Sequence, residues 1–333
     1  MYSDHYGFSE KPFQLTPDPR FWYESRTHRK AMAYLGYGLA QGEGFIVITG
    51  DIGAGKTTLV GHLLATIDRA RFTAINVVST QVEGDDMLRL VAQGLGLPTE
   101  GVAKAQVLDR IERSLDEEAR AGRNVLLIVD EAQNLPNSAL EELRMLSNYQ
   151  VNGRSLVQIF LLGQPEFRDR MRESAGLEQL RQRVIATHHL DPMESDEVEP
   201  YIRFRLKQAG YQGNPVFAQD VYPVVFDATG GVPRTINTLM GRVLLAGAIE
   251  GLERIDGQVV EEVAREARAE GVRRASSISS YQPAPSAEPD RIAALEARLV
   301  EQEATLQRIL GLLINWVEAD NEATRRNPHS DAA

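Results

Sequence analysis

Cysteine is absent from the 333 residues of this sequence, which excludes disulfide bonds, thiol catalysis and metal sites with cysteine ligands. The sequence also lacks an apolar run of the roughly 18–20 residues that a membrane-spanning helix needs, and its first residues do not resemble a signal peptide. The net charge of −11 gives no overall attraction to nucleic acid or to anionic membranes. These absences predict a cytoplasmic protein without an integral membrane segment.

A glycine-rich motif carries the strongest functional signal. Residues 50–57 read G-D-I-G-A-G-K-T, a complete phosphate-loop pattern, and they follow the apolar, β-branched segment 44–49. Glycines let backbone N–H groups curl around the β-phosphate, the Lys56 amine reaches the β- and γ-phosphates, and the Thr57 hydroxyl reaches Mg²⁺. The sequence therefore predicts a nucleoside triphosphate site formed by Gly50, Asp51, Ile52, Gly53, Ala54, Gly55, Lys56, Thr57 and Thr58.

An acidic pair further along the chain indicates hydrolysis. The continuous apolar run 125–129 is typical of a strand buried on both faces, and it ends in Asp130 and Glu131. Asp130 is expected to hold Mg²⁺, and Glu131 to polarise the water that attacks the γ-phosphate. The pair argues against a small-molecule kinase, in which a substrate hydroxyl is the nucleophile. No guanine-reading N-K-x-D string occurs, so ATP is preferred to GTP.

Strand-like and helical patterns alternate between residue 44 and about residue 190. This alternation predicts an α/β fold with a five-stranded parallel sheet covered by helices on both faces. A hydrophobic content of 43% is ample for such a core. The expected strands are Phe45–Thr49, Phe72–Val78, Val125–Val129, Val157–Leu162 and Val184–His189, and the expected helices include Thr27–Leu39, Ala105–Ala121 and Ala139–Tyr149.

The nucleotide-binding domain is predicted to span residues 30–191. The segments before and after it differ from it in composition. Residues 1–29 are rich in aromatic residues and proline, and we expect an irregular arm packed on the ATPase core. Strand signals stop after residue 191, so residues 192–270 are predicted to form a small helical domain. Beyond it the sequence predicts a flexible Ser/Pro linker over residues 271–289. Residues 290–320 have apolar residues in 3,4 spacing and are predicted to form a coiled coil or amphipathic helix, and residues 321–333 a disordered tail.

Taken together, these motifs resemble those of an AAA+ ATPase. More narrowly, they resemble the general secretion pathway protein A (ExeA-like) family, and within it the secretion ATPases encoded with exosortase and exopolysaccharide (PEP-CTERM) loci. The resemblance covers residues 1 to about 270 and is carried by Tyr6-Gly7-Phe8, Pro12-Phe13-x-Leu15-Thr16-Pro17-Asp18-Pro19, the phosphate loop, Val129-Asp130-Glu131-Ala132-Gln133 and Leu161-Leu162-Gly163-Gln164-Pro165. ExeA-like proteins usually continue into a transmembrane helix and a peptidoglycan-binding domain, whereas the linker and heptads follow here.

The resemblance implies roles for polar residues outside the two nucleotide motifs. Gln164 occupies the sensor 1 position, and Arg234 in Gly-Gly-x-Pro-Arg matches sensor 2, so both join Lys56 and Glu131 in the expected catalytic set. Arg181 or Arg183 is expected to reach the site of a neighbouring subunit as an arginine finger, and Arg183 is favoured because it stands next to a strand start. The alternative for each of these side chains is a structural role, as a polar group at a strand end, at a helix end or on the surface. A finger that acts in trans requires a homo-oligomer, either a ring or a transient assembly.

Three hypotheses for function follow. The first is an AAA+ ATPase that hydrolyses Mg·ATP to remodel or assemble an envelope secretion or exopolysaccharide export system, held at the inner membrane by a partner that residues 290–320 contact. The alternatives are a DNA-binding ATPase of the transposition or origin-loading type, and an ATP-gated scaffold. A basic tract or winged-helix module after the helical domain would favour DNA, but a Ser/Pro linker and an acidic heptad segment stand there, so nucleic acid is the disfavoured partner.

Overall fold

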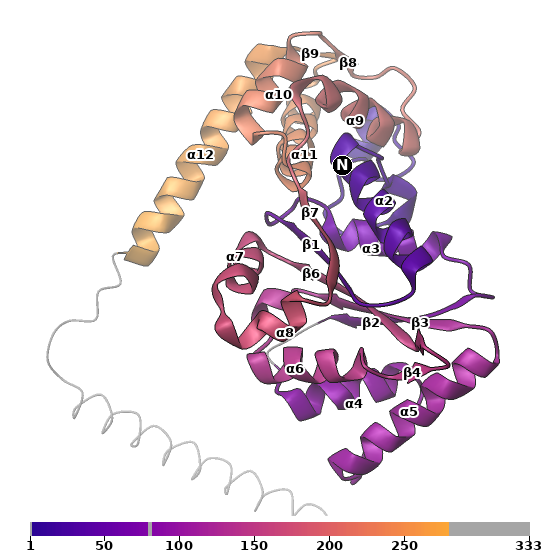
Figure 1. Cartoon of the computed structure of the whole chain (residues 1–333). Coiled ribbons are helices and arrows are strands. Elements are labelled where there is room, and N and C mark those ends of the chain that lie inside the picture. The colour runs from indigo at the N-terminus through magenta and orange to yellow at the C-terminus, as the bar shows by residue number, and fades with distance from the viewer. Residues whose placement is uncertain (1, 79–81, 280–333) are drawn as a thin grey trace, which may run out of the picture. The chain divides into compact units, whose positions relative to one another are not determined.

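The computed structural model describes residues 2–78 and 82–279 (Figure 1). Side chains are described up to residue 270. The described residues up to Arg268 form one compact unit. The predicted heptad helix and tail, residues 290–333, lie outside the described residues. None of the described helices combines the length and hydrophobicity needed to cross a membrane.

A five-stranded parallel sheet forms the centre of the compact unit, and this part of the predicted fold is confirmed. Its strands are β1 (Phe45–Gly50), β2 (Phe72–Val78), β3 (Asn124–Asp130), β6 (Val157–Gly163) and β7 (Val184–Leu190), in the order β2-β3-β6-β1-β7. Because the strands are parallel, the ends of β1, β3 and β6 lie at the same edge of the sheet. The phosphate loop, the acidic pair and Gln164 each follow one of these ends, so the topology brings them together.

Helices cover both faces of the sheet, and the side chains of each strand point alternately to one face and the other. Val47 and Leu127 belong to a core with helices α4 (Gly84–Gly94), α5 (Lys104–Arg120) and α6 (Asn137–Leu146). Ile48 and Ile128 face the opposite way and pack with α2 (Arg26–Gln41) and α3 (Lys56–Thr66). Three further elements complete this region, namely α7 (Pro165–Glu173), α8 (Glu178–Arg181) and the short hairpin of β4 (Gln150–Val151) with β5 (Arg154–Ser155). Helix α4 and the hairpin were not among the predicted elements.

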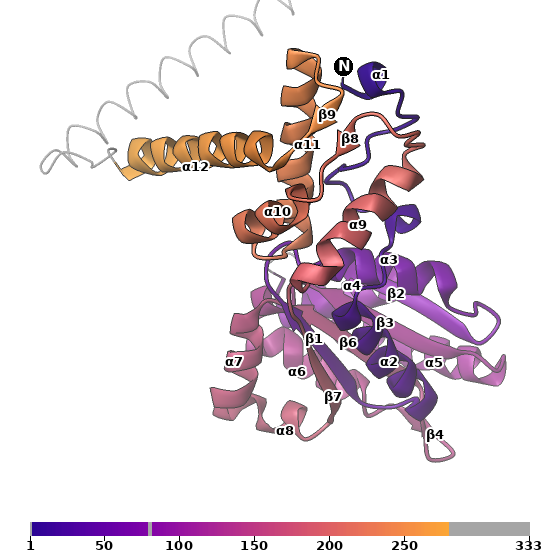
Figure 2. The same ribbon diagram turned by 90° about the horizontal axis from the view of Figure 1, so that it is seen from above.

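Helices dominate the chain after β7, as expected. Figure 2 shows α9 (Ser195–Gln208), α10 (Val221–Thr229) and α11 (Pro233–Glu250) grouped on one side of the sheet. Their apolar faces form a separate core with the first part of α12 (Gly257–Ser279). The expectation that strands stop after residue 191 is wrong in one detail, because β8 (Val216–Phe217) pairs in parallel with β9 (Arg254–Ile255). Strands of two residues carry no periodicity from which they could be predicted.

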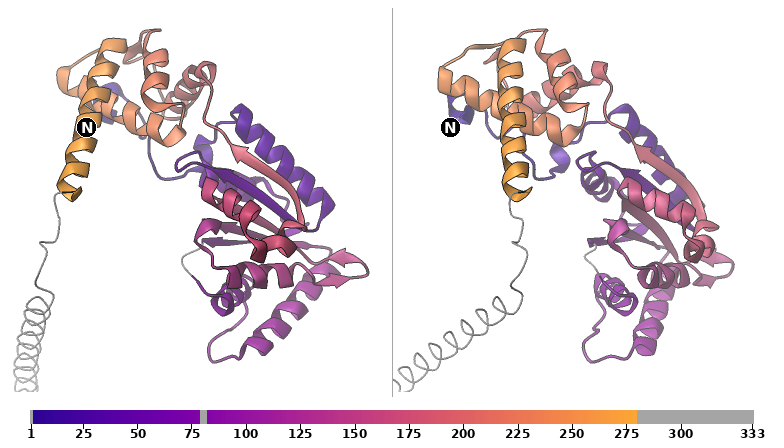
Figure 3. Two further views of the ribbon diagram at one scale, coloured as in Figure 1. Left: turned by 60° about the vertical axis from the view of Figure 1, so that its left-hand side comes forward. Right: turned by 90° about the vertical axis from the view of Figure 1, so that its left-hand side faces the viewer.

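The N-terminal arm contacts a different surface from the one expected. Tyr6, Phe8 and Phe13 are buried in the core of the helical region, and Figure 3 shows the N-terminus beside those helices. Only the end of the arm reaches the sheet-bearing region, where Trp22 stacks on His62 of α3 with ring centroids 4.4 Å apart. The expected packing on the ATPase core is therefore corrected, since aromatic composition predicts burial but not which apolar surface covers it.

Helix α12 extends into the segment that was predicted to be a linker. Helix α12 continues to Ser279, past the predicted domain end at residue 270, so residues 271–279 are helical. Residues 261–275 consist largely of alanine, glutamate and arginine, which favour helix, and no proline stands before Pro283 to end it. The remainder of the predicted linker, residues 280–289, lies outside the described residues.

Candidate nucleotide-binding site

The phosphate loop joins the end of β1 to the start of α3. Gly53 and Gly55 have φ values of 88° and 97°, in the left-handed region that a residue with a side chain rarely adopts. Gly55 is the N-cap of α3, so the free N–H groups of the first helical turn face the loop. The loop thus has the backbone that an anion-binding helix N-terminus needs.

Lys56 is buried and turned toward its own loop. Its Nζ donates hydrogen bonds to the carbonyl oxygens of Gly50 at 2.7 Å and Asp51 at 3.1 Å. Burial lowers the pKa of Lys56, and the nearby carboxylates of Glu131 and Asp130 oppose that shift. The two acids therefore help to keep the amine charged at the position where phosphate oxygens are expected.

Thr57 and Asp130, the two predicted Mg²⁺ ligands, are in direct contact. The Thr57 hydroxyl donates to Asp130 Oδ2 at 3.0 Å, while Asp130 Oδ1 accepts from the backbone N–H of Glu131 at 2.9 Å. A hydroxyl and a carboxylate are oxygen donors of the kind that Mg²⁺ prefers. These residues therefore fit a magnesium ion next to the phosphate loop.

Glu131 lies at the same edge and is held by two glutamines. Gln133 Nε2 donates to Glu131 Oε2 at 2.5 Å, and Gln164 Nε2 lies 3.4 Å from the same oxygen. The predicted sensor 1 residue, Gln164, thus sits between the acidic pair and the loop, as the sheet order requires. Asn76 of β2 is exposed, and in the described part of the chain no hydrogen bond joins it to Glu131.

The helical region reaches the phosphate loop through Arg234. Its backbone N–H donates to the carbonyl of Gly53 at 3.2 Å, and a Cβ placed on Gly53 would lie 2.5 Å from the Arg234 Cβ. Pro233 occupies the first turn of α11, where a missing N–H has no cost. The structure therefore brings the predicted sensor 2 arginine to the loop, and the glycine at position 53 permits this close approach.

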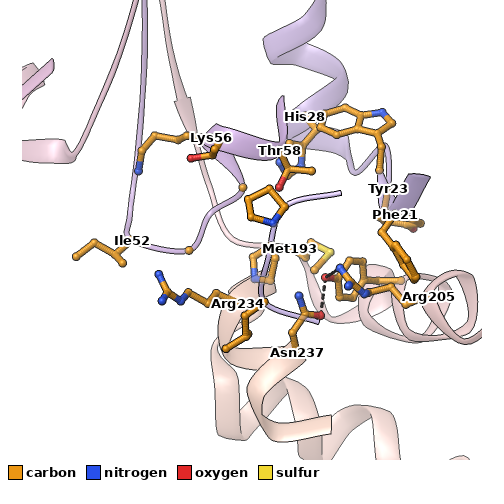
Figure 4. Close-up of a pocket in the computed structure, with 18 of the residues that line it drawn as sticks. Phe21, Tyr23, His28, Ile52, Lys56, Thr58, Met193, Arg205, Arg234 and Asn237 are labelled. Carbon is orange, nitrogen blue, oxygen red and sulfur yellow. Dashed lines mark hydrogen bonds between the residues drawn. The ribbon is translucent and has the colours of Figure 1, made fainter. Parts of the chain in front are cut away.

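A cavity of about 450 Å³ lies where the arm, the phosphate loop and the helical region meet. Figure 4 shows Lys56 and Arg234 toward one end of it and Phe21, Tyr23 and Arg205 toward the other. Its volume is in the range of small-ligand pockets. The end with Lys56 and Arg234 suits the phosphates of a nucleotide, and the aromatic end suits its base.

Three residues at the aromatic end were not predicted from the sequence. Tyr201 is buried and donates its hydroxyl to Asn237 Oδ1 at 2.8 Å. The Arg205 guanidinium lies 4.7 Å from the centre of the Phe21 ring and donates to the carbonyls of Pro12 at 2.6 Å and Gln14 at 3.2 Å. Arg205 thereby fastens the arm to α9 on this side of the cavity. The only sequence signal for this end was the concentration of aromatic residues in the arm.

His28 of α2 packs against the phosphate loop at Gly55. Its Nδ1 lies 2.7 Å from the Ser25 hydroxyl, and a Cβ placed on Gly55 would lie 2.7 Å from its Nε2. Burial lowers the pKa of His28 to about 4, so the ring is neutral at pH 7. This contact could not be predicted from the sequence, because it depends on how α2 packs beside the loop.

Neither candidate arginine finger lines the cavity of its own chain. The Arg183 guanidinium donates to the Ser147 carbonyl and hydroxyl oxygens, both at 3.1 Å, at the end of α6. Arg181 pairs with Glu178 and donates to the Met171 carbonyl at 3.1 Å. Both lie near the start of β7, so any action on a nucleotide would be on that of another subunit.

Known proteins resemble both the sequence and the fold. Residues 39–171 match the AAA domain family. Over 256 residues the chain is 36% identical to the General secretion pathway protein A of Aeromonas hydrophila, an alignment that covers 77% of this chain and 46% of that protein. The chain therefore spans about half the length of this relative.

Solved structures with a similar fold have low sequence identity. The ORC2 protein of Aeropyrum pernix in its ADP form aligns with a TM-score of 0.60 and 18% identity, over 78% of this chain and 73% of that one. Cdc6p from Pyrobaculum aerophilum gives 0.60 and 17%, over 77% and 70%. The ORC1 protein of Aeropyrum pernix in complex with DNA gives 0.58 and 16%, over 83% and 73%. The parallel sheet, the phosphate loop and these likenesses together identify a P-loop AAA+ fold, and the chain carries an AAA ATPase domain that is similar to General secretion pathway protein A.

Proposed function

We propose that this chain binds Mg·ATP in the cavity between the arm, the phosphate loop and the helical region, hydrolyses it, and uses the cycle to remodel or assemble an envelope secretion or exopolysaccharide export system. The observation that carries the chemistry is the convergence of Lys56, Glu131 and Arg234 on one cavity. Similarity to General secretion pathway protein A supports the biological setting.

Each residue of the site has a defined part in the proposed reaction. Lys56 and the loop N–H groups bind the phosphates, and Arg234 adds a cation from the helical region. Thr57 and Asp130 would hold Mg²⁺, which would neutralise charge on the transferred phosphoryl group. Glu131 accepts a proton from the attacking water, and Gln164 helps to orient that water.

Two kinds of partner belong to this proposal, further copies of this chain and a protein of the export system. A homo-oligomer would place Arg183 of one subunit at the nucleotide of the next, as a ring or as a transient assembly. Residues 290–320, outside the described part of the chain, would bind an export-system protein and hold the ATPase at the inner membrane as a peripheral protein. The DNA-binding alternative gains no support from the likeness to the ORC1 protein in complex with DNA, because at 16% identity that likeness shows the fold alone.

A chromosomal Glu131→Gln replacement in the native host tests this proposal. We expect the loss of exported polysaccharide or secreted protein, because the variant would bind ATP without completing the cycle. An Asp109→Asn replacement on the exposed surface of α5 serves as the control and should export normally. Normal export combined with a defect in replication or transposition would overturn the export role in favour of the DNA-binding alternative.

A further inference from the structure

Gln133 occupies an unusual position beside Glu131. It lies in the 3₁₀ turn Ala132–Asn134 that follows β3 directly. Glu131 itself has a φ of 54°, in the left-handed region that costs a non-glycine residue free energy. Strain of this kind persists where surrounding contacts fix the backbone, and it places the Glu131 side chain next to the Gln133 amide.

The two ends of the Gln133 amide have different partners. Its Oε1 accepts a hydrogen bond from the backbone N–H of Gln164 at 3.0 Å, while its Nε2 donates to Glu131 Oε2 at 2.5 Å. The Gln164 N–H can only donate, so it fixes which end of the amide is the oxygen. The nitrogen must therefore point toward the Glu131 carboxylate.

The turn that carries Gln133 is anchored independently of its side chain. Arg170 of α7 donates to the carbonyl of Leu135 at 2.6 Å, just after the turn. Leu135 and Ala132 are also buried in the core. Replacing the Gln133 side chain should therefore leave the backbone of the turn in place.

The two oxygens of the Glu131 carboxylate have different environments. Oε2 lies within hydrogen-bond distance of both Gln133 and Gln164. Oε1 has no hydrogen-bond partner in the described part of the chain, and Glu131 lines the cavity. One oxygen is therefore held by the protein and the other is available to a water molecule.

We propose that Gln133 is a positioning residue for ATP hydrolysis, which holds Glu131 by Oε2 so that Oε1 accepts the proton of the attacking water. This inference rests on the proposed role of Glu131 as the general base. In the step concerned, the water oxygen forms a bond to the γ-phosphorus and its proton passes to Oε1. The bond from phosphorus to the β–γ bridging oxygen breaks, and ADP leaves with that electron pair. Gln133 touches neither water nor nucleotide, and acts through Glu131.

A Gln133→Glu variant of the full chain separates positioning from structure. The new carboxylate still accepts from the Gln164 N–H, but it cannot donate to Glu131. We expect kcat to fall by about 10–100-fold with an unchanged Kd for ATP. Gln106→Glu on exposed α5 is the matched control and should change neither quantity.

Gln133→Met is the second variant, because it loses both hydrogen bonds without adding charge. It should lower kcat to a similar extent and leave the Kd for ATP unchanged. Turnover within about twofold of wild type in either variant, or a Kd for ATP that rises in step with the fall in kcat, would overturn the positioning role. Such a result with an inactive Glu131→Gln chain rejects Gln133 alone, whereas an active Glu131→Gln chain rejects the proposed base itself.

Discussion

Lys56→Ala is expected to abolish ATP binding and, with it, all turnover. The amine is held within 3.1 Å of two loop carbonyls at the edge where the phosphates would lie, and Glu131 and Asp130 favour its charged form. Charge-assisted hydrogen bonds contribute about 1.5–3 kcal/mol each, so losing two raises the Kd by about 100-fold or more. Isothermal titration with Mg·ATP measures the change directly.

The matched control is Lys104→Ala. Lys104 is a surface lysine paired with Asp85 and Glu142, away from the cavity, so its loss should leave the Kd unchanged. A Lys56→Ala chain that bound ATP within a few-fold of wild type would move the phosphate site elsewhere.

Arg183→Ala is expected to bind ATP normally and to lose hydrolysis by about 10³–10⁵-fold, the range for an arginine finger. The structure adds a condition, because Arg183 is bound to Ser147 within its own chain and must release these bonds to reach a neighbour. Mixing Arg183→Ala with Lys56→Ala chains should restore some activity, since one kind of mixed interface joins an intact loop to an intact arginine.

Two variants separate a role of Arg183 in hydrolysis from a role in stabilising the end of α6. Ser147→Ala removes one acceptor of Arg183 without removing its charge, so it should retain turnover. Arg181→Ala tests the other candidate, whose guanidinium binds the Met171 carbonyl. Wild-type turnover in Arg183→Ala, with a large loss in Arg181→Ala, would assign the finger to Arg181.

Local patterns account for what the sequence predicted well. The phosphate loop depends on glycine spacing within residues 50–57, and the acidic pair follows a continuous apolar strand, so both could be placed without tertiary information. Helix α4 was missed although its buried Met87, Leu88, Val91 and Ala92 follow a helical repeat. That signal was available in the sequence.

Other features depend on contacts between distant segments. The orientation of the Gln133 amide is set by the backbone of Gln164, which follows a different strand. The Arg205 contacts with the carbonyls of Pro12 and Gln14 join segments that composition alone cannot pair. Sequence periodicity predicts which face of an element is buried, but not which element covers it. The arm was assigned to the wrong surface for this reason.

A paired measurement on Glu131→Gln tests the proposed mechanism most directly, by comparing the equilibrium Kd for Mg·ATP with the rate of phosphate release. Glutamine keeps the size of the side chain but cannot accept a proton from water. We expect a Kd close to that of wild type and a rate lowered by about 10²–10⁴-fold, the usual contribution of a general base. Loss of ATP affinity in parallel with turnover, or a rate near that of wild type, would contradict the assignment of Glu131 as the base.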